Sequence, residues 1–150
     1  MFTGASTFFL WGATVLNADF VGSSVSIVDL LVHESSHVLL FGLSFSEGLT
    51  RNSGEARYDS PVRADKRPID GIFHACFVTT RVHLAMKRLL DSGSLRDDDG
   101  KLAIQHCQHN EKAGRESLAV LARHAEPTRL GTAILHELED YWANQPECVT

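Results

Sequence analysis

The sequence predicts a mostly α-helical α+β domain, with a short β-strand or hairpin near the N-terminus followed by about four helices. Two observations support this prediction. One aromatic and β-branched segment occupies residues 7–16, and segments with helical apolar periodicity fill most of the remaining chain. The chain has 150 residues and no repeat or linker that would divide it. We therefore expect residues 1–150 to form a single domain.

The N-terminal part predicts a strand followed by a helix. Residues 7–16 read TFFLWGATVL, and such aromatic and β-branched side chains favour one or two short strands. Ser26 and Asp29 have the spacing of a capping box, in which a serine and an acidic side chain satisfy backbone N–H groups at a helix start. An apolar-rich helix is therefore expected over residues 27–41, ended by Gly42.

The rest of the chain predicts a long loop and three helices. Residues 43–67 contain glycine, proline and scattered charges, which is typical of a loop. A proline in the first turn favours a helix over residues 68–90, and an acidic triplet precedes a helix over residues 101–125. In residues 128–143, large apolar side chains recur every four positions and predict a helix with one buried face.

Composition excludes some functions. The chain has 14 basic and 19 acidic residues, a formal net charge of -5 and no basic stripe, so nucleic-acid binding is not expected. Cys76, Cys107 and Cys148 are far apart and predict neither a disulfide framework nor a thiolate metal site. The apolar start lacks a basic region and is interrupted before it could span a bilayer. We expect a cytoplasmic protein without a membrane span.

His33, Glu34 and His37 form an HExxH motif inside the expected helix over residues 27–41. Four steps of about 100° bring the second histidine within roughly 40° of the first on one side of the helix. Two imidazoles at this spacing can bind one divalent metal, and the motif places an acid within reach of a metal-bound water. The motif therefore predicts a metal-binding catalytic domain.

A metal needs a third protein ligand, and the candidates are His74, His83, Asp59, Asp65 and Asp70. We prefer His74, because it lies in the first two turns of the next helix, where one helix crossing another can bring it to the HExxH histidines. His83 lies too far along that helix to share a metal with His74. His106 and His109 lie three residues apart on a charged stretch, which is more typical of a solvated face than of a metal site.

Two stretches of the chain resemble a known family. The first reads LVHESSHVLL from residue 31, and the second reads YDSPVRADKRPIDGIFHACFV from residue 58. Together they resemble the HExxH motif and the later Y-x-PWR-x-DPRP-x-x-G-x-x-H pattern of the HExxH-motif peptide-modification proteins, which belong to bacterial peptide natural-product clusters. The matching residues keep the order and spacing of that pattern: Arg63, Arg67, Pro68, Gly71 and His74.

The resemblance implies a function, because studied members of that family are similar to iron(II)- and 2-oxoglutarate-dependent peptide β-hydroxylases. It implies an oxygenase that hydroxylates a carbon of a peptide or amino-acid-like substrate in natural-product biosynthesis. The implied iron ligands are His33, His37 and His74. Arginine's planar fork suits a carboxylate, so Arg63 and Arg67 are candidates to bind 2-oxoglutarate, or else pair with surface aspartates. Tyr58 could add a hydroxyl to that site, or pack the loop.

The order of a strand, an HExxH helix and a later helix with the third ligand is also similar to the core of zinc-protease-type domains. A zincin-like scaffold is therefore expected. A zinc metallohydrolase or peptidase remains an alternative function, with Glu34 as general base and a later carboxylate, such as Glu111 or Glu116, completing the site. A third alternative is a non-catalytic partner in a biosynthetic complex, because Val62 and Lys66 depart from the family pattern.

Overall fold

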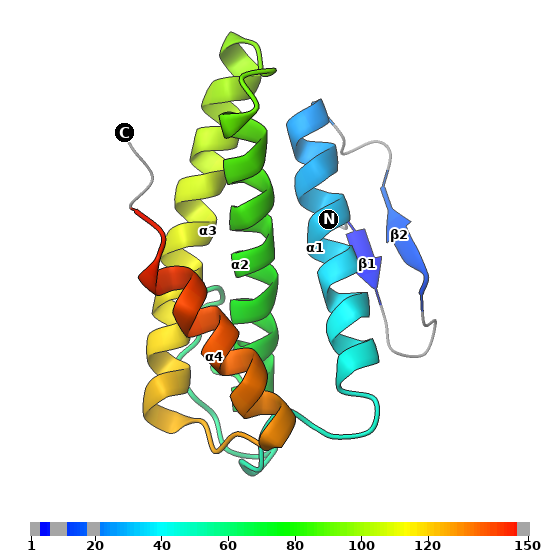
Figure 1. The fold of residues 1–150 in the computed structure, drawn as a ribbon. Helices are drawn as coiled ribbons and strands as arrows, with labels where there is room; N and C mark the ends of the chain where they lie inside the picture. Colours follow the sequence, from blue (N-terminus) through cyan, green and yellow to red (C-terminus); the bar gives the residue numbers. More distant parts are fainter. Residues whose placement is uncertain (1–3, 7–11, 18–21, 147–150) are drawn as a thin grey trace.

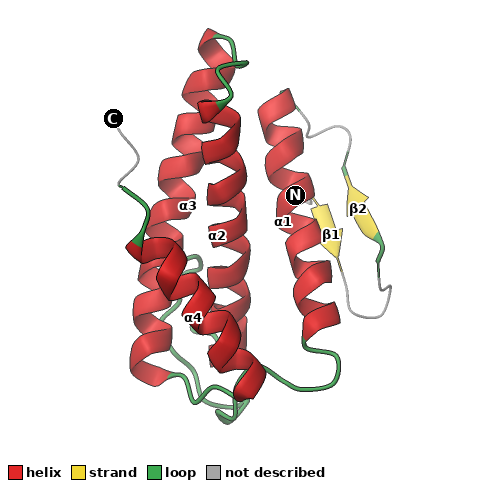
Figure 2. Cartoon of the chain, viewed as in Figure 1, coloured by secondary structure: helices red, strands yellow, loops and turns green. Residues whose placement is uncertain are grey.

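The computed structural model describes residues 4–6, 12–17 and 22–146, and the chain is mostly helical. The elements in chain order are β1 (Gly4–Ser6), β2 (Thr14–Leu16), α1 (Ser24–Leu43), α2 (Ile69–Asp91), α3 (Asp97–His124) and α4 (Arg129–Ala143). The prediction of a mostly α-helical fold is therefore confirmed. β1 and β2 are antiparallel and pair Ala5 with Val15; Figure 2 shows that they lie together at one side of the helices.

α2 and α3 form a long antiparallel hairpin at the centre of the fold (Figure 1). α1 lies beside α2, the β1–β2 ribbon lies on the outer side of α1, and α4 crosses the hairpin. Residues 44–68 connect α1 to α2 around the base of the hairpin. α1 and α3 begin at the same end of the molecule, where the Ser24 hydroxyl donates to Asp99 Oδ2 (3.3 Å). These two helices therefore run in the same direction, with α2 antiparallel to both.

The start of α1 differs from the prediction. Ser23 is the N-cap, and its hydroxyl accepts a hydrogen bond from the backbone N–H of Ser26 (3.1 Å). The predicted capping box of Ser26 and Asp29 is wrong, because both residues already lie inside the helix. The Asp29 carboxylate instead accepts a hydrogen bond from His106 of α3. Asp29 therefore joins two helices rather than capping one.

Other boundaries lie close to those predicted. α2 begins at Ile69, with Pro68 as the N-cap. α3 begins at Asp97, earlier than expected, because the acidic triplet forms its first turn, where negative charge is stabilised by the helix dipole. Of the expected N-terminal strand, Thr14–Leu16 is observed as β2, while residues 7–11 lie outside the described residues.

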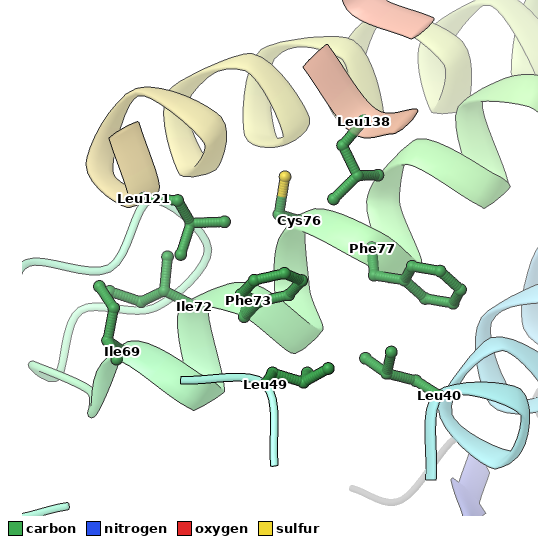
Figure 3. Packing of buried hydrophobic residues seen from close by; sticks show 9 residues of the cluster. All are labelled: Leu40, Leu49, Ile69, Ile72, Phe73, Cys76, Phe77, Leu121 and Leu138. Carbon is green, nitrogen blue, oxygen red and sulfur yellow. The ribbon is translucent and has the colours of Figure 1, made fainter. Parts of the chain in front are cut away.

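The main hydrophobic core joins all four helices to the connection between α1 and α2 (Figure 3). Leu40 of α1, Leu49 of the connection, Phe73 of α2 and Leu138 of α4 belong to it, and none is more than 5% exposed. A second cluster joins the other halves of α1, α2 and α3: Val25, Val78, Val82, Met86, Ala103 and Cys107. Because Leu49 is part of the main core, the long connection is anchored by packing rather than free.

α1 has an unusual surface for a packed helix. Leu31, Leu39 and Leu43 are each more than 40% exposed. In the described part of the chain, α1 is the one helix that is long and apolar enough to cross a membrane by length and composition. Core helices of soluble proteins can have the same composition, and here Val25 and Leu40 of α1 are completely buried.

α4 is held against α2 and α3 by close packing and buried hydrogen bonds. A Cβ added to Gly114 of α3 would lie 2.4 Å from the Trp142 ring, so only glycine allows this approach. Trp142 Nε1 donates to the Thr80 hydroxyl (3.0 Å), and the Tyr141 hydroxyl shares a hydrogen bond with His83 Nδ1 (2.6 Å). α4 is therefore tied to both helices of the hairpin.

Replacing Gly131 of α4 by alanine should destabilise the fold. An added Cβ would lie 1.9 Å from the backbone oxygen of Leu49, which cannot move aside as a flexible side chain can. We expect the free energy of unfolding to fall by about 1–3 kcal/mol. Gly100→Ala is the control, because a Cβ there meets no atom within 4 Å. Urea unfolding measures both variants, and equal stability would contradict the close contact of α4 with the connection.

The buried His83 should make the fold sensitive to acid. Burial lowers the pKa of His83 from 6.5 to about 4, against the opposing influence of Glu111. The unfolded chain therefore binds a proton at this side chain at a higher pH than the folded chain. Stability should consequently fall as the pH drops from 6.5 towards 4. We expect His83 to account for a loss of roughly 1–3 kcal/mol over that range.

Urea unfolding near pH 7 and near pH 5 tests this expectation. His83→Gln should lose less stability on acidification than the wild type, because glutamine does not titrate. His136→Gln is a matched control, since His136 also bonds through Nδ1, to Asp140 (3.2 Å), but its side chain is 70% exposed. Equal acid sensitivity of the wild type and His83→Gln would show that His83 is not the titrating group.

Candidate metal centre

A cavity of about 810 Å³ lies between α1, α2 and α3, and part of the connection between α1 and α2 closes it. Its polar lining comes from all four segments: Asp29, His33 and His37 of α1, Ser60, Arg63 and Arg67 of the connection, His74 and Thr79 of α2, and Gln105, His106, His109 and Asn110 of α3. The α1 residues recur every four positions, so they lie on one face of the helix. The cavity therefore brings together side chains that are far apart in the sequence.

The three histidines expected to bind a metal all line this cavity. His33 and His37 are one turn apart on α1, with ring centroids 5.1 Å apart. His74 of α2 lies across from them, with its ring centroid 5.9 Å from that of His37. Phe41 covers the group, with its ring 5.3 Å from that of His74. The structure therefore brings the HExxH histidines and His74 together, as the sequence predicts.

The imidazoles of His37 and His74 are neutral at neutral pH. Burial, together with the neighbouring His33 and His74, lowers the pKa of His37 to about 4. Burial also lowers the pKa of His74, against the opposing influence of Asp70. A neutral imidazole keeps a lone pair on one ring nitrogen, which is the form that binds a metal. The protonation states of His37 and His74 therefore suit ligands.

The ring spacings test whether a metal would fit. Metal–nitrogen bonds of about 2.0–2.1 Å in a tetrahedral site place imidazole centroids roughly 5 Å apart. The His33–His37 spacing of 5.1 Å matches this value, whereas the His37–His74 spacing of 5.9 Å is wider. Within the described ranges, no three His, Cys, Asp or Glu side chains already stand in a ligating arrangement. Three imidazoles are a suitable donor set for a divalent metal, and binding would require a shorter His37–His74 spacing than the one observed.

The other candidates for third ligand do not line the cavity. Asp59 bonds Lys66 (3.2 Å), and Asp70 accepts from the Thr50 hydroxyl (2.6 Å). Asp65 pairs with both loop arginines, and His83 lies against Tyr141 and Trp142. Each of these side chains therefore has another partner, which for Asp65 is the pair of arginines that line the cavity. His74 is the one of the five candidates that shares the cavity with the HExxH histidines.

Glu34 does not line the cavity with the two histidines of its motif. Its side chain is 6% exposed, and it is not among the residues that line the cavity. Neighbouring residues on a helix point about 100° apart, so Glu34 does not share the helix face of His33 and His37. Of the later carboxylates, Glu111 accepts a hydrogen bond from Arg115 (3.0 Å) and also lies outside the lining.

Arg63 and Arg67 line the cavity beside the histidines. Both pair with Asp65, Arg63 at 2.9 Å and Arg67 at 3.6 Å, and all three side chains are at least 40% exposed. The hydrogen bond from Arg63 lowers the pKa of the Asp65 carboxyl. Asp65 shows that this pair of guanidinium groups can hold a carboxylate. Because the ion pairs are solvent-exposed, another carboxylate can replace Asp65 at low cost.

Tyr58 packs the connection instead of lining the cavity. Its backbone exchanges two hydrogen bonds with that of Arg67 (2.8 and 2.9 Å), forming an isolated antiparallel bridge. Its ring lies 5.1 Å from that of His124, and its hydroxyl accepts from Asn52 Nδ2 (3.4 Å). Of the two roles considered for Tyr58, the structure places it in the packing role. It fixes the backbone position of Arg67 at the cavity.

The α3 wall contains functional candidates that sequence reasoning missed. The expectation of a solvated face is wrong for His106, whose side chain is 29% exposed, bonds Asp29 and lines the cavity. His109 also lines the cavity but is exposed, as expected. Asn110 is buried in the same wall. Spacings of three and four residues between positions 106, 109 and 110 were the available signal, because such residues share one helix face.

Comparison of the chain with models of protein families and with curated proteins gave no match.

Proposed function

We propose that the protein is an iron(II)- and 2-oxoglutarate-dependent oxygenase that hydroxylates a carbon of a peptide or amino-acid-like substrate. The observation that carries this proposal is that three histidines and two arginines, in the order of the family pattern, line one cavity. The substrate class and its place in natural-product biosynthesis rest on the resemblance described above.

Different residues of the chain would bind the metal and 2-oxoglutarate. His33, His37 and His74 would hold the metal on one side and leave its other side open to ligands. When bound, iron(II) would supply the oxidising chemistry with dioxygen and 2-oxoglutarate as co-substrates: one oxygen atom of dioxygen replaces the C–H bond by a C–OH bond, and the other enters the succinate that remains after 2-oxoglutarate loses carbon dioxide. Arg63 and Arg67 would exchange Asp65 for the distal carboxylate of 2-oxoglutarate, which their planar guanidinium groups can bind in a bidentate manner.

The cavity is large enough for a second molecule. Its volume of about 810 Å³ lies in the upper part of the range for small-molecule sites. Val62, Ala75 and Val78 give it apolar walls between the polar groups. Such walls exclude water and hold a reacting carbon near the histidines.

A zincin-like arrangement belongs to the same proposal. Its support is the order of elements: a β-ribbon, an HExxH helix, and a second helix whose His74 faces the first. The zinc hydrolase alternative requires Glu34 beside a metal-bound water, and the position of Glu34 outside the cavity lining disfavours it. The wide His37–His74 spacing favours the third alternative, a non-catalytic protein that retains no metal.

Anaerobic addition of iron(II) and then 2-oxoglutarate should produce a visible charge-transfer band. His74→Ala should abolish this band, because the metal then loses its third ligand and only the two histidines of α1 remain. His136→Ala, at an exposed histidine outside the cavity, should keep it. The absence of a band, together with zinc-dependent peptide cleavage that is lost in Glu34→Gln, would favour the hydrolase. Failure to retain any metal would favour the non-catalytic alternative.

Removal of either loop arginine should weaken 2-oxoglutarate binding without loss of iron. A charged hydrogen bond contributes about 1.5–3 kcal/mol, so Arg63→Ala or Arg67→Ala should raise the 2-oxoglutarate concentration at half-maximal band intensity by about tenfold or more. Arg57→Ala is the control, because Arg57 lies on the same connection but donates to the Gly54 and Ala56 carbonyls. An unchanged concentration in both cavity variants would place the distal carboxylate elsewhere.

A further inference from the structure

The cavity has a second polar end, formed by Asp29 of α1 with His106 and Asn110 of α3. Asp29 lies eight residues before His37 on the same helix, which corresponds to about 12 Å along the axis. The side chains of Asp29 and His106 form a hydrogen bond, and α1 and α3 run in the same direction. This end of the cavity is therefore about two helical turns from His37.

Three of the side chains at this end have hydrogen-bond acceptors: Asp29, His106 and Asn110. The Asp29 carboxylate accepts a hydrogen bond from His106 Nδ1–H, so in the neutral ring Nε2 carries the free lone pair. Asn110, which is 7% exposed, donates its amide nitrogen to the His106 backbone carbonyl (2.8 Å), which leaves its amide oxygen as an acceptor. These three side chains thus each offer a hydrogen-bond acceptor. The hydrogen bond to Asp29 fixes the orientation of the His106 ring.

The opposite end of the cavity offers hydrogen-bond donors instead of acceptors. Arg63 and Arg67 supply guanidinium donors there, and the histidines lie between the two ends. An occupant of the whole cavity would therefore present a carboxylate at one end and N–H or O–H donors at the other. 2-Oxoglutarate at neutral pH has two carboxylates and no such donor, so it matches only the arginine end.

We propose that Asp29, His106 and Asn110 form the substrate-recognition end of the cavity, where backbone N–H groups of a peptide substrate donate to His106 Nε2 and the Asn110 oxygen. The assignment of the arginine end to 2-oxoglutarate rests on the proposed function. His106 is a positioning residue in this account: it holds the substrate so that a carbon lies beside the three histidines. The α3 wall thereby selects peptides over molecules without N–H donors.

The ring of His106 gives the first test, which requires no variant. In the wild-type protein labelled with ¹⁵N-histidine, two-bond NMR correlations report which ring nitrogen carries the proton. The hydrogen bond to Asp29 predicts that the neutral His106 ring carries its proton on Nδ1, with a bare Nε2. Asp29→Asn should weaken that preference, because an uncharged amide oxygen is a weaker acceptor for Nδ1–H than a carboxylate. A proton on Nε2, in the neutral or the charged ring, would overturn the proposal, since no acceptor would face the substrate.

The second test measures binding without iron or 2-oxoglutarate. The labelled protein is titrated with an equimolar mixture of N-acetylated tetrapeptide amides, which carry N–H donors and no carboxylate terminus. We expect a saturable shift of the His106 ring resonances. Asn110→Ala and His106→Gln should each weaken binding by about fivefold, the effect of one neutral hydrogen bond. His136→Gln is the control, because it removes a histidine that is paired with Asp140 outside the cavity.

The results separate this inference from the proposed function. A charge-transfer band without any peptide-dependent shift at His106 would overturn the recognition end and leave the oxygenase intact. Peptide binding at His106 without a band would support the recognition end and overturn the oxygenase. If His106→Gln is unfolded by circular dichroism, Asn110→Ala decides the matter, and unchanged peptide binding in that variant would overturn the role of the α3 wall.

Discussion

The packing of α1 against α2 is the constraint on which the site depends. Leu40 of α1 is buried beside Phe73 of α2 in the main core, and Arg81 Nε of α2 donates to the Ser36 hydroxyl of α1 (3.0 Å). These contacts fix the rotation of α1 about its axis and so place His37 beside His74. A rotation by one residue, about 100°, would carry the HExxH histidines out of the cavity. The core and the candidate metal centre are therefore set by one helix interface.

The same interface determines which chemical groups line each part of the cavity. Guanidinium groups of the connection, imidazoles of α1 and α2, and acceptors of α1 and α3 line successive parts of it. The neutral state of His37 is a consequence of burial between helices, not of its sequence neighbours alone. The connection contributes because Leu49 anchors it in the core and the backbone bridge from Tyr58 fixes Arg67. Packing of Leu49 and the backbone bridge at Arg67 thus tie the connection to the rest of the fold.

The sequence was sufficient for features that depend on local spacing. The mostly helical fold and the shared face of His33 and His37 follow from periodicity within one helix. Features that depend on contacts between helices were not accessible. The role of His106 requires knowing that α3 meets α1 at Asp29, and the packing role of Tyr58 requires its contact with His124. The wrong capping box has a local cause, since nearby serines can serve equally as helix caps.

A crystal structure of the anaerobic complex with iron(II) and 2-oxoglutarate would show directly whether the three histidines bind a metal. We expect one metal ion bound by the two HExxH histidines and His74, with the distal carboxylate of 2-oxoglutarate on the loop arginines. A metal bound at another place, or with Glu34 among its ligands and His74 left out, would contradict the proposed metal centre.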